Sequence, residues 1–330
     1  MNKFQFIGSS LMNTMDKIKI DKAIVTGGAG FVGSHIIKKL LAGGSKVVCI
    51  DNMVSGSMAN VQDFMSNPNF KLVTSNITNY PSIEEEFNDT DVVFHQAASK
   101  ATVCLRDPYT DLNSNAKGTY NVLEASRKHG VKKVLYSSTG SVYGEAQYYP
   151  QDEDHPLNPL SFYGVSKLAA EKYCNAFQNY YDMDITVLRY FHVFGPNQSY
   201  SNLGGVVSIF IRRILNGKPP IIYGTGEQTR SFTFVEDDVD ANLFFCKKGF
   251  GKGEVYNCAS GIKVTINELA HKLLKIMDRE DLNPIYKDWR PGDIINFDVS
   301  NKKLIDLNFK FRTSFEDGLL KTIEWLKDRV

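Results

Sequence analysis

A tyrosine and a lysine stand four positions apart in the segment Tyr163-Gly-Val-Ser-Lys167. This spacing brings a phenol and an ammonium group to one face of a helix. A phenol normally ionises near pH ~10, and a neighbouring cation favours the phenolate. Tyr163 is therefore a candidate base for a substrate hydroxyl, with Lys167 lowering the pKa of the phenol. The alternative is an ordinary helix with a solvated lysine, because this spacing is common by chance.

Several hydroxyl side chains precede this pair in the segment 137–144, Ser-Ser-Thr-Gly-Ser-Val-Tyr-Gly. The segment follows an apolar run typical of a strand, and ligands bind beyond the carboxyl ends of the strands in open parallel sheets. Thr139 is a candidate to share a proton with a substrate oxygen. Taken singly, Ser137, Ser138 and Ser141 are interpreted as local backbone caps.

A glycine-rich segment, Thr-Gly-Gly-Ala-Gly-Phe-Val-Gly, occupies residues 26–33 and reads as GxGxxG from Gly28 or GxxGxxG from Gly27. Such glycines let the backbone approach a pyrophosphate at a helix N-terminus. Asp51 lies 21 positions after Gly30, at the end of the next apolar run. A carboxylate there accepts hydrogen bonds from both ribose hydroxyls and repels a 2′-phosphate. The pattern predicts NAD rather than NADP, and the alternative is a tight turn with a solvated aspartate.

Alternating strands and helices must position these residues. Strands are predicted at Lys22–Thr26, Lys46–Ile50, Phe70–Thr74, Asp91–His95, Lys133–Ser137 and Ile185–Tyr190, and helices at Phe31–Ala42, Leu112–His129 and Leu160–Tyr181. Apolar strands separated by helices indicate βαβ units and a parallel sheet covered on both faces.

The pattern loosens after residue 195. Helices are predicted at Val206–Asn216, Asp237–Lys247, Ile266–Met277 and Phe315–Arg329, and a strand at Glu254–Asn257. The predicted fold class is α/β, a Rossmann-type doubly wound parallel sheet with a smaller C-terminal α/β substrate domain. We expect an N-terminal extension at 1–21, a dinucleotide-binding domain at 22–195 with returning segments at about 232–262, and a substrate domain mainly within 196–330.

Composition excludes several classes of protein. Of 330 residues, 42% are apolar and 23% charged, which is typical of a globular protein rather than a disordered or fibrous one. Lys and Arg number 38 against 37 Asp and Glu, so the near-neutral charge argues against nucleic acid or anionic lipid as main partner. No apolar run exceeds four residues, so we expect no membrane span. The five cysteines are scattered, with no CxxC pair, and we therefore expect no disulfide framework, no metal site and a cytoplasmic location.

The joint set of motifs resembles the extended short-chain dehydrogenase/reductase family, and within it the nucleotide-sugar epimerases, typified by UDP-glucose 4-epimerase. The likeness runs from about Lys22 to the C-terminus. It rests on the glycine-rich segment, Asp51-Asn52, the segment 137–144 and Tyr163–Lys167, with further matches at His95–Ala98, Lys100, Asn115–Thr119, Leu188–Phe191, Arg230–Phe232 and Arg290–Asp293.

The resemblance implies a role for individual residues in NAD binding. Gly27, Gly30 and Phe31 would hold the pyrophosphate, and Asp51 and Asn52 the adenosine ribose. Lys167 would serve both the catalytic base and the nicotinamide ribose. The other residues implied to contact NAD are Val32, Asn76, Ile77, Ala97, Ala98, Lys100, Asn115, Ser137, Tyr163 and Tyr190.

The resemblance also implies a substrate site. Thr139 would align with the catalytic hydroxyl of the family and Tyr163 with its base. Arg230, Arg290 and Asp293 would hold the substrate nucleotide, since guanidinium groups match phosphate oxygens; taken singly, either arginine is interpreted as a solvated surface charge. The remaining predicted substrate contacts are His192, Val206, Val207, Tyr223 and Phe297.

Four departures from the family pattern bear on the reaction and the substrate. Sugar-nucleotide dehydratases usually carry Asp-Glu where Gly140-Ser141 follows Thr139 here, which disfavours dehydration. His192 replaces an asparagine that usually contacts substrate, which leaves the substrate open; a positioning or packing role is favoured for it over catalysis. Phe297 stands at a size gate and argues against a large N-acetylated hexose. Asn76 replaces an acidic residue near the adenine.

The first functional hypothesis is a nucleotide-sugar 4-epimerase acting on a UDP- or GDP-linked sugar. NAD would oxidise C4, the 4-keto sugar would rotate, and hydride would return to the other face. The second is a 4-dehydrogenase that releases the keto sugar, for example from a GDP-heptose. A 4,6-dehydratase and a non-catalytic NAD-binding protein are less favoured, because Thr139, Tyr163 and Lys167 are all present. The family usually dimerises through its two long helices, here Leu112–His129 and Leu160–Tyr181, and polysaccharide precursor synthesis is the expected context.

Overall fold

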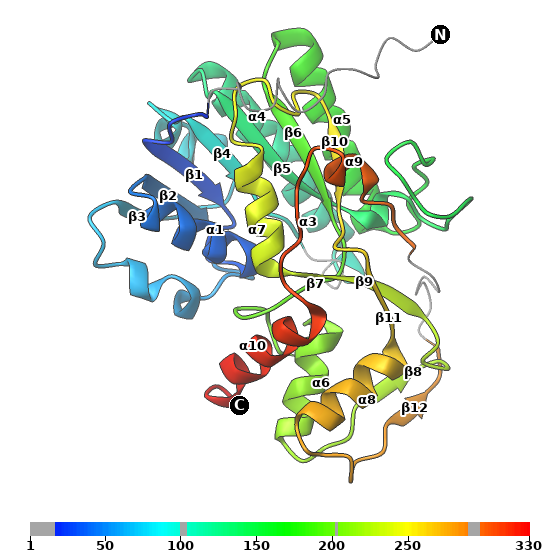
Figure 1. The fold of residues 1–330 in the computed structure, drawn as a ribbon. Helices are drawn as coiled ribbons and strands as arrows, with labels where there is room; N and C mark the ends of the chain where they lie inside the picture. The colour runs from blue at the N-terminus through cyan, green and yellow to red at the C-terminus, as the bar shows by residue number, and fades with distance from the viewer. Residues whose placement is uncertain (1–16, 100–103, 202–203, 290–297) are drawn as a thin grey trace.

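The computed structural model describes residues 17–99, 104–201, 204–289 and 298–330. Its central feature is a parallel sheet of seven strands with the order β10-β6-β5-β4-β1-β2-β3 (Figure 1). The strands are β1 (Lys22–Thr26), β2 (Lys46–Asp51), β3 (Phe70–Thr74), β4 (Val92–His95), β5 (Lys133–Thr139), β6 (Ile185–Tyr190) and β10 (Val255–Cys258). The strand order reverses between β1 and β4, where doubly wound sheets bind ligands.

Helices cover both faces of this sheet because successive side chains of a strand point to opposite sides. Val25 packs in a cluster with α1 (Phe31–Ala42) and α7 (Val235–Phe244). Its neighbour Ile24 packs in a second cluster with α4 (Gly118–Lys128) and α5 (Phe162–Tyr181). The predicted α/β class with a doubly wound parallel sheet is therefore confirmed.

Most segments after residue 190 form a smaller layer below the carboxyl ends of the strands, whereas α7 and β10 lie with the large sheet (Figure 1). The smaller layer contains a three-stranded sheet of β7 (Val193–Phe194), β9 (Thr229–Phe234) and β11 (Ile262–Thr265), and a two-stranded parallel sheet of β8 (Ile221–Tyr223) and β12 (Ile285–Lys287). Its helices are α6 (Val206–Leu215), α8 (Ile266–Ile276) and α10 (Phe315–Lys327), and a short helix, α9 (Lys302–Ile305), lies beside β10.

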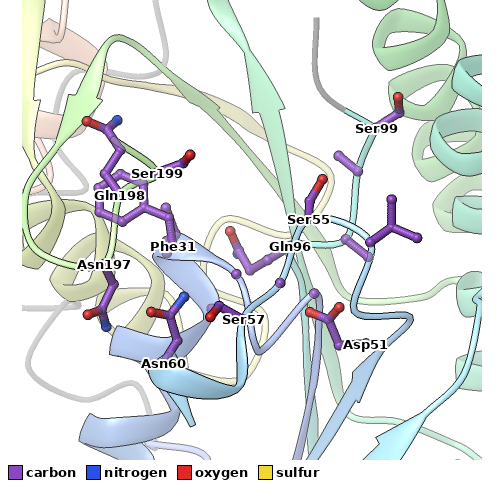
Figure 2. A pocket seen from close by; sticks show the side chains of 18 of the residues that line it. Phe31, Asp51, Ser55, Ser57, Asn60, Gln96, Ser99, Asn197, Gln198 and Ser199 are labelled. Carbon is purple, nitrogen blue, oxygen red and sulfur yellow. The ribbon is translucent and has the colours of Figure 1, made fainter. Parts of the chain in front are cut away.

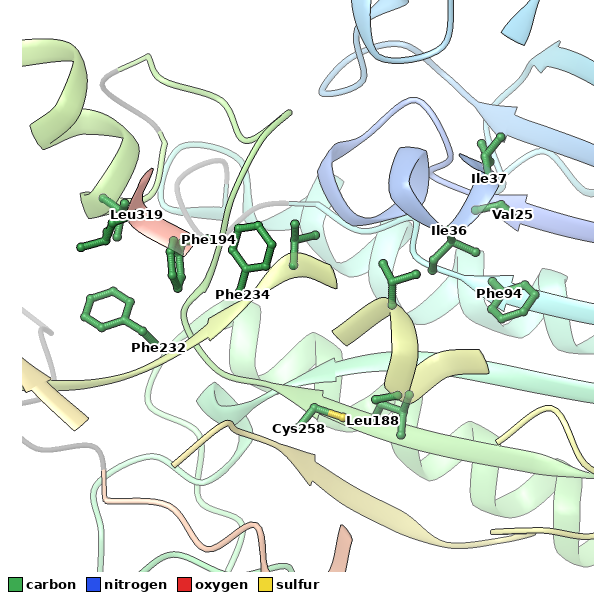
Figure 3. Close-up of a cluster of buried hydrophobic side chains, with 14 of the residues drawn as sticks. Val25, Ile36, Ile37, Phe94, Leu188, Phe194, Phe232, Phe234, Cys258 and Leu319 are labelled. Atoms are coloured by element: carbon green, nitrogen blue, oxygen red, sulfur yellow. The ribbon is translucent and has the colours of Figure 1, made fainter. Parts of the chain in front are cut away.

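The larger apolar cluster is continuous between the two layers (Figure 3). It extends from Val25 and Ile36 beside the large sheet to Phe194, Phe232 and Leu319 in the smaller layer. The chain also returns from the smaller layer to the large sheet: β9 belongs to the three-stranded sheet, and the later strand β10 pairs with β6 in the large sheet. The domain boundary at residue 195 stays a prediction.

Several element boundaries differ from the sequence predictions. The predicted helix Leu112–His129 begins earlier, as α3 (Pro108–Leu112), and is interrupted by a π-helical turn at Asn113–Lys117 before α4 begins. The predicted helix Asp237–Lys247 is α7, Val235–Phe244. The strands β7, β8, β9, β11 and β12 were not predicted; β7, β8 and β12 have only two or three residues, which is too short for a periodic signal.

In the part of the chain that the structure describes, no helix combines the length and apolar character needed to cross a lipid bilayer.

Gly33, in the first turn of α1, is expected to tolerate no side chain. A Cβ at this position would lie 2.4 Å from the carbonyl oxygen of Gly27 and 2.8 Å from Cα of Gly28. Gly33→Ala should lower the free energy of unfolding by about 1–3 kcal/mol, measured by urea denaturation. Gly43→Ala at the other end of α1 is the control, since its Cβ would meet nothing closer than 3.3 Å. Equal losses in the two variants would contradict the prediction.

Candidate active site

One cavity of about 890 Å³ opens at the carboxyl ends of the strands of the large sheet (Figure 2). Its walls come from the turn after β1, the segments after β2, β3 and β4, the end of β5, the first turns of α5, and the segment after β7. Most residues predicted to bind NAD line it: Gly27, Gly30, Phe31, Val32, Asp51, Asn52, Asn76, Ile77, Ala97, Ala98, Ser137, Tyr163, Lys167 and Tyr190. Thr139 lines the same cavity.

The glycine turn between β1 and α1 has the form that a dinucleotide diphosphate requires. Gly27 has a φ of +65°, and a Cβ there would lie 2.7 Å from the backbone of Ala97. Gly30 is the N-cap of α1 and has no side chain to accept from the N–H groups of the first turn. These N–H groups, with the helix dipole, favour an anion at the cavity wall. The residues present therefore fit NAD.

The Asp51 carboxylate is fixed at the end of β2 by two backbone donors. Oδ2 accepts from the amide of Ala29 at 3.0 Å, and Oδ1 accepts from the amide of Met53 at 2.8 Å. Burial raises the pKa of Asp51, and the two hydrogen bonds oppose that rise. The structure thus brings the acidic residue to the cavity wall on the side opposite Asn197–Ser199 (Figure 2).

Asp51→Asn is expected to weaken NAD binding by at least about tenfold, because hydrogen bonds to a charged acceptor are the stronger ones. NADP binding should change less, so the preference for NAD over NADP should fall. Titration calorimetry with both cofactors measures the two dissociation constants. Asp63→Asn is the control, since Asp63 is exposed and does not line the cavity. An unchanged NAD to NADP ratio in Asp51→Asn would refute the assigned role.

The three predicted catalytic residues meet at one end of the cavity. Burial raises the pKa of the Tyr163 phenol to about 12, and the nearby Thr139 hydroxyl opposes this rise in pKa. Lys167 is buried, and its Nζ donates to the carbonyl oxygen of Ser137 at 2.5 Å. Burial lowers the pKa of this ammonium group to about 8. The hydrogen bond of this lysine goes to the backbone, and the expected lowering of the Tyr163 pKa by Lys167 stays a prediction.

Asn115 lies beside the cavity rather than in its wall. Its Oδ1 accepts from the amide of Ser99 at 2.8 Å, and its Nδ2 donates to Ser166 Oγ at 2.9 Å and Asp111 Oδ1 at 3.1 Å. Asn115 occupies the π-helical turn, a feature often found at functional sites. Asn115 therefore links the segment after β4 to α5. Its partner on α5, Ser166, is the residue that precedes Lys167.

The predicted substrate residues are more dispersed. His192, Val206, Val207, Tyr223 and Arg230 do not line this cavity, and Lys100, Arg290, Asp293 and Phe297 lie outside the described residues. His192 is half-buried and packs against the ring of Phe232, with ring centroids 5.9 Å apart. Burial, with the charge of Arg230 adding to it, lowers the pKa of His192 to about 3, so the imidazole is neutral near pH 7.

The cavity is also lined by residues that the sequence analysis did not predict. After β2, Asn60 Nδ2 donates to the carbonyl of Ala29 at 2.9 Å, and Ser57 lies in the same wall. The segment Asn197–Ser201 and two residues near the C-terminus, Trp325 and Arg329, complete it. Glycine spacing and strand order carry no signal for these residues, since they reach the cavity only through the tertiary fold.

Comparison with known proteins agrees with this geometry. Residues 23–259 match the model of the NAD-dependent epimerase/dehydratase family. The UDP-glucose 4-epimerase of Mycolicibacterium smegmatis is 34% identical over 315 residues, covering 93% of this chain and 99% of that protein. The crystal structure of a UDP-glucose 4-epimerase from Thermotoga maritima with UDP-glucose has a TM-score of 0.88 at 36% identity, over 93% of this chain and 99% of that one. The Thermus thermophilus UDP-glucose 4-epimerase in complex with NAD has a TM-score of 0.83 at 31% identity, over 94% and 100%.

Relatives with other activities also match. A UDP-N-acetyl-alpha-D-glucosaminuronate decarboxylase of Bacillus cytotoxicus is 31% identical over 319 residues, which is 93% of this chain and 98% of that protein. A dTDP-glucose 4,6-dehydratase structure from Streptomyces venezuelae has a TM-score of 0.87 at 27% identity, over 93% and 97%. These relatives share the fold and differ in the reaction.

Proposed function

The chain belongs to the NAD-dependent epimerase/dehydratase family, and we propose that it is a nucleotide-sugar 4-epimerase acting on a UDP-linked sugar. It is an NAD-dependent enzyme of the extended short-chain dehydrogenase/reductase type. One observation carries the proposal: Thr139, Tyr163 and Lys167 line the same cavity as the glycine turn and Asp51. A hydroxyl placed beside Tyr163 would thus lie at the catalytic end of the dinucleotide site.

The side chains of this chain supply orientation and proton transfer. NAD bound in this cavity would supply the acceptor for the hydride of the sugar C4 and would later return that hydride. The Tyr163 phenolate takes the proton of the C4 hydroxyl as that hydride leaves, which produces a 4-keto sugar. Thr139, which lines the cavity together with Tyr163, can hold the same sugar oxygen. After the keto sugar rotates, hydride returns to its opposite face and Tyr163 gives the proton back, so no net oxidation occurs.

The surroundings of Thr139 support epimerisation over dehydration. A Cβ at Gly140 would lie 2.3 Å from the ring of Phe191, so this position has no room for an acidic side chain next to the catalytic hydroxyl. Ser141 follows, and the Thr139 hydroxyl donates to its Oγ at 3.3 Å. Neither residue is an acid that could drive the loss of water from the keto sugar.

A panel of UDP-, GDP-, CDP- and dTDP-sugars tests the proposal, read by NADH absorbance and by NMR of the sugar. We expect a C4 epimer of a UDP-sugar without net NADH. Net NADH with a 4-keto sugar would make the protein a dehydrogenase, and turnover of GDP-sugars alone would overturn the UDP assignment. Release of CO₂ from a UDP-hexuronic acid would instead indicate the decarboxylase activity named for one relative.

We also propose that the protein is a homodimer that buries the outer faces of α3 and α5. Large apolar side chains are exposed there: Tyr109 is 73% exposed, Phe162 59% and Val165 53%. α3 and α5 pack against each other, and large exposed apolar patches on neighbouring elements mark association sites. Size-exclusion chromatography with light scattering should give twice the chain mass of 37.1 kDa, and a monomer at micromolar concentration would refute the dimer. Cytoplasmic location and a role in polysaccharide synthesis stay predictions.

A further inference from the structure

The C-terminal helix α10 reaches the dinucleotide cavity through one short segment of chain. The segment Asn197–Ser201 lines the cavity and contacts an element at each end. Asn197 Nδ2 donates to Ser34 Oγ, in the first turn of α1, at 3.0 Å. The ring of Tyr200 meets the ring of Trp325, on α10, edge to face at a centroid distance of 6.1 Å. The C-terminal end of α10 therefore lies on the side of the cavity where α1 begins.

Arg329, two residues beyond the end of α10, is oriented by Trp325. Its guanidinium lies over the indole ring, 4.8 Å from the centroid, and its Nη1 donates to the carbonyl oxygen of Trp325 at 2.8 Å. Among the described residues, no carboxylate forms an ion pair with it. A guanidinium has five N–H donors, so donors remain for a ligand.

The positions of the other charged side chains around the cavity indicate what Arg329 could bind. The charged side chains among its described lining residues are Asp51, Lys167 and Arg329. Asp51 is negative and is fixed at the ribose end, while Lys167 is held at the catalytic end by the Ser137 carbonyl. A dinucleotide diphosphate carries two negative charges, and the N-terminus of α1 contributes only about half a positive charge. Among the described lining residues, Arg329 is the positively charged side chain on the side of the cavity where α1 begins.

We propose that Arg329, oriented by Trp325, binds the diphosphate of the dinucleotide cofactor. The proposal deepens the proposed function, because it rests on the same cavity holding NAD. A guanidinium near a diphosphate forms charge-assisted hydrogen bonds, and an exposed cation acts more weakly as salt concentration rises. Arg329 therefore adds an affinity for phosphates that is independent of the nicotinamide.

Calorimetric titration of the full-length protein with ADP-ribose and with adenosine tests the assignment. Arg329→Met should weaken ADP-ribose binding by about tenfold at low salt and leave adenosine binding within about twofold. The loss should shrink at ~0.5 M salt. Arg329→Lys should recover most of the affinity. Lys327→Met is the matched control, since it removes one exposed charge from the end of the same helix without altering the cavity lining.

The outcomes separate this inference from the proposed function. Equal affinities for ADP-ribose in Arg329→Met and Lys327→Met, or an equal loss for adenosine, would refute the role of Arg329 whatever reaction the protein catalyses. A selective loss of ADP-ribose binding with no epimerase activity in the unaltered protein would leave the inference standing and refute the proposed reaction. Thermal denaturation of Arg329→Met should match that of Lys327→Met, which distinguishes a binding role from a structural one.

Discussion

Tyr163→Phe is expected to lower kcat by about 10²- to 10⁴-fold while NAD binding is retained. The phenol is the proton acceptor, and phenylalanine keeps the aromatic ring in the cavity wall without an ionisable group. The ring lies at the catalytic end of the cavity, away from Asp51 and the glycine turn, so the cofactor contacts predicted for those residues persist. The kcat of the unaltered protein should rise with pH, because the phenolate is the minor form below the pKa of about 12 that burial gives this phenol.

Single-turnover kinetics with the active UDP-sugar measure this effect, and calorimetry measures NAD affinity in parallel. Tyr180→Phe on the same helix is the control, because its side chain is 84% exposed and should leave kcat unchanged. Activity within tenfold of the unaltered protein would show that another group accepts the proton. Loss of NAD binding together with activity would indicate a structural role for the phenol.

Glu171→Gln is expected to lower the free energy of unfolding by about 3–5 kcal/mol, the largest stability effect we foresee. Glu171 and Arg189 are both buried and form a bidentate pair, with Nε–Oε1 at 3.0 Å and Nη2–Oε2 at 2.7 Å. Ser138 donates to Glu171 at 2.5 Å, and Arg189 donates to the Tyr143 hydroxyl at 2.8 Å. Glutamine would leave the guanidinium charge buried without a counter-charge and place an amide donor against it.

Urea denaturation of Glu171→Gln measures the loss, and the chain offers a matched control. Glu124 and Arg127 form a bidentate pair of similar geometry on the surface of α4, so Glu124→Gln should cost at most about 1 kcal/mol. If Glu171→Gln fails to fold, the double variant Glu171→Leu with Arg189→Met should recover soluble protein, because apolar residues can replace a buried pair. A similar small loss in both single variants would contradict the prediction.

Local sequence signals were sufficient for the large sheet and for much of the cavity. The glycine turn, Asp51 and the Tyr163–Lys167 pair each lie within one βα unit or one helix, and parallel strands bring their carboxyl ends to the same edge. Once the parallel sheet has formed, these motifs necessarily lie close together at its carboxyl edge. The π-helical turn at Asn113–Lys117 could not be predicted, because a single turn of five residues is too short to leave a periodic signal of its own.

By itself the sequence determined the α/β class, the NAD-type glycine turn and the three residues at the catalytic end, since all depend on contacts between near neighbours and on strand order. Only the tertiary structure decided that Lys167 hydrogen-bonds to the Ser137 carbonyl, that His192 packs against Phe232, and that position 140 has no room for a side chain. It also brought Arg329 to a cavity whose glycine turn lies some three hundred residues earlier in the chain. Such contacts join segments with no shared periodicity, so their energies come from packing and desolvation that no local pattern records.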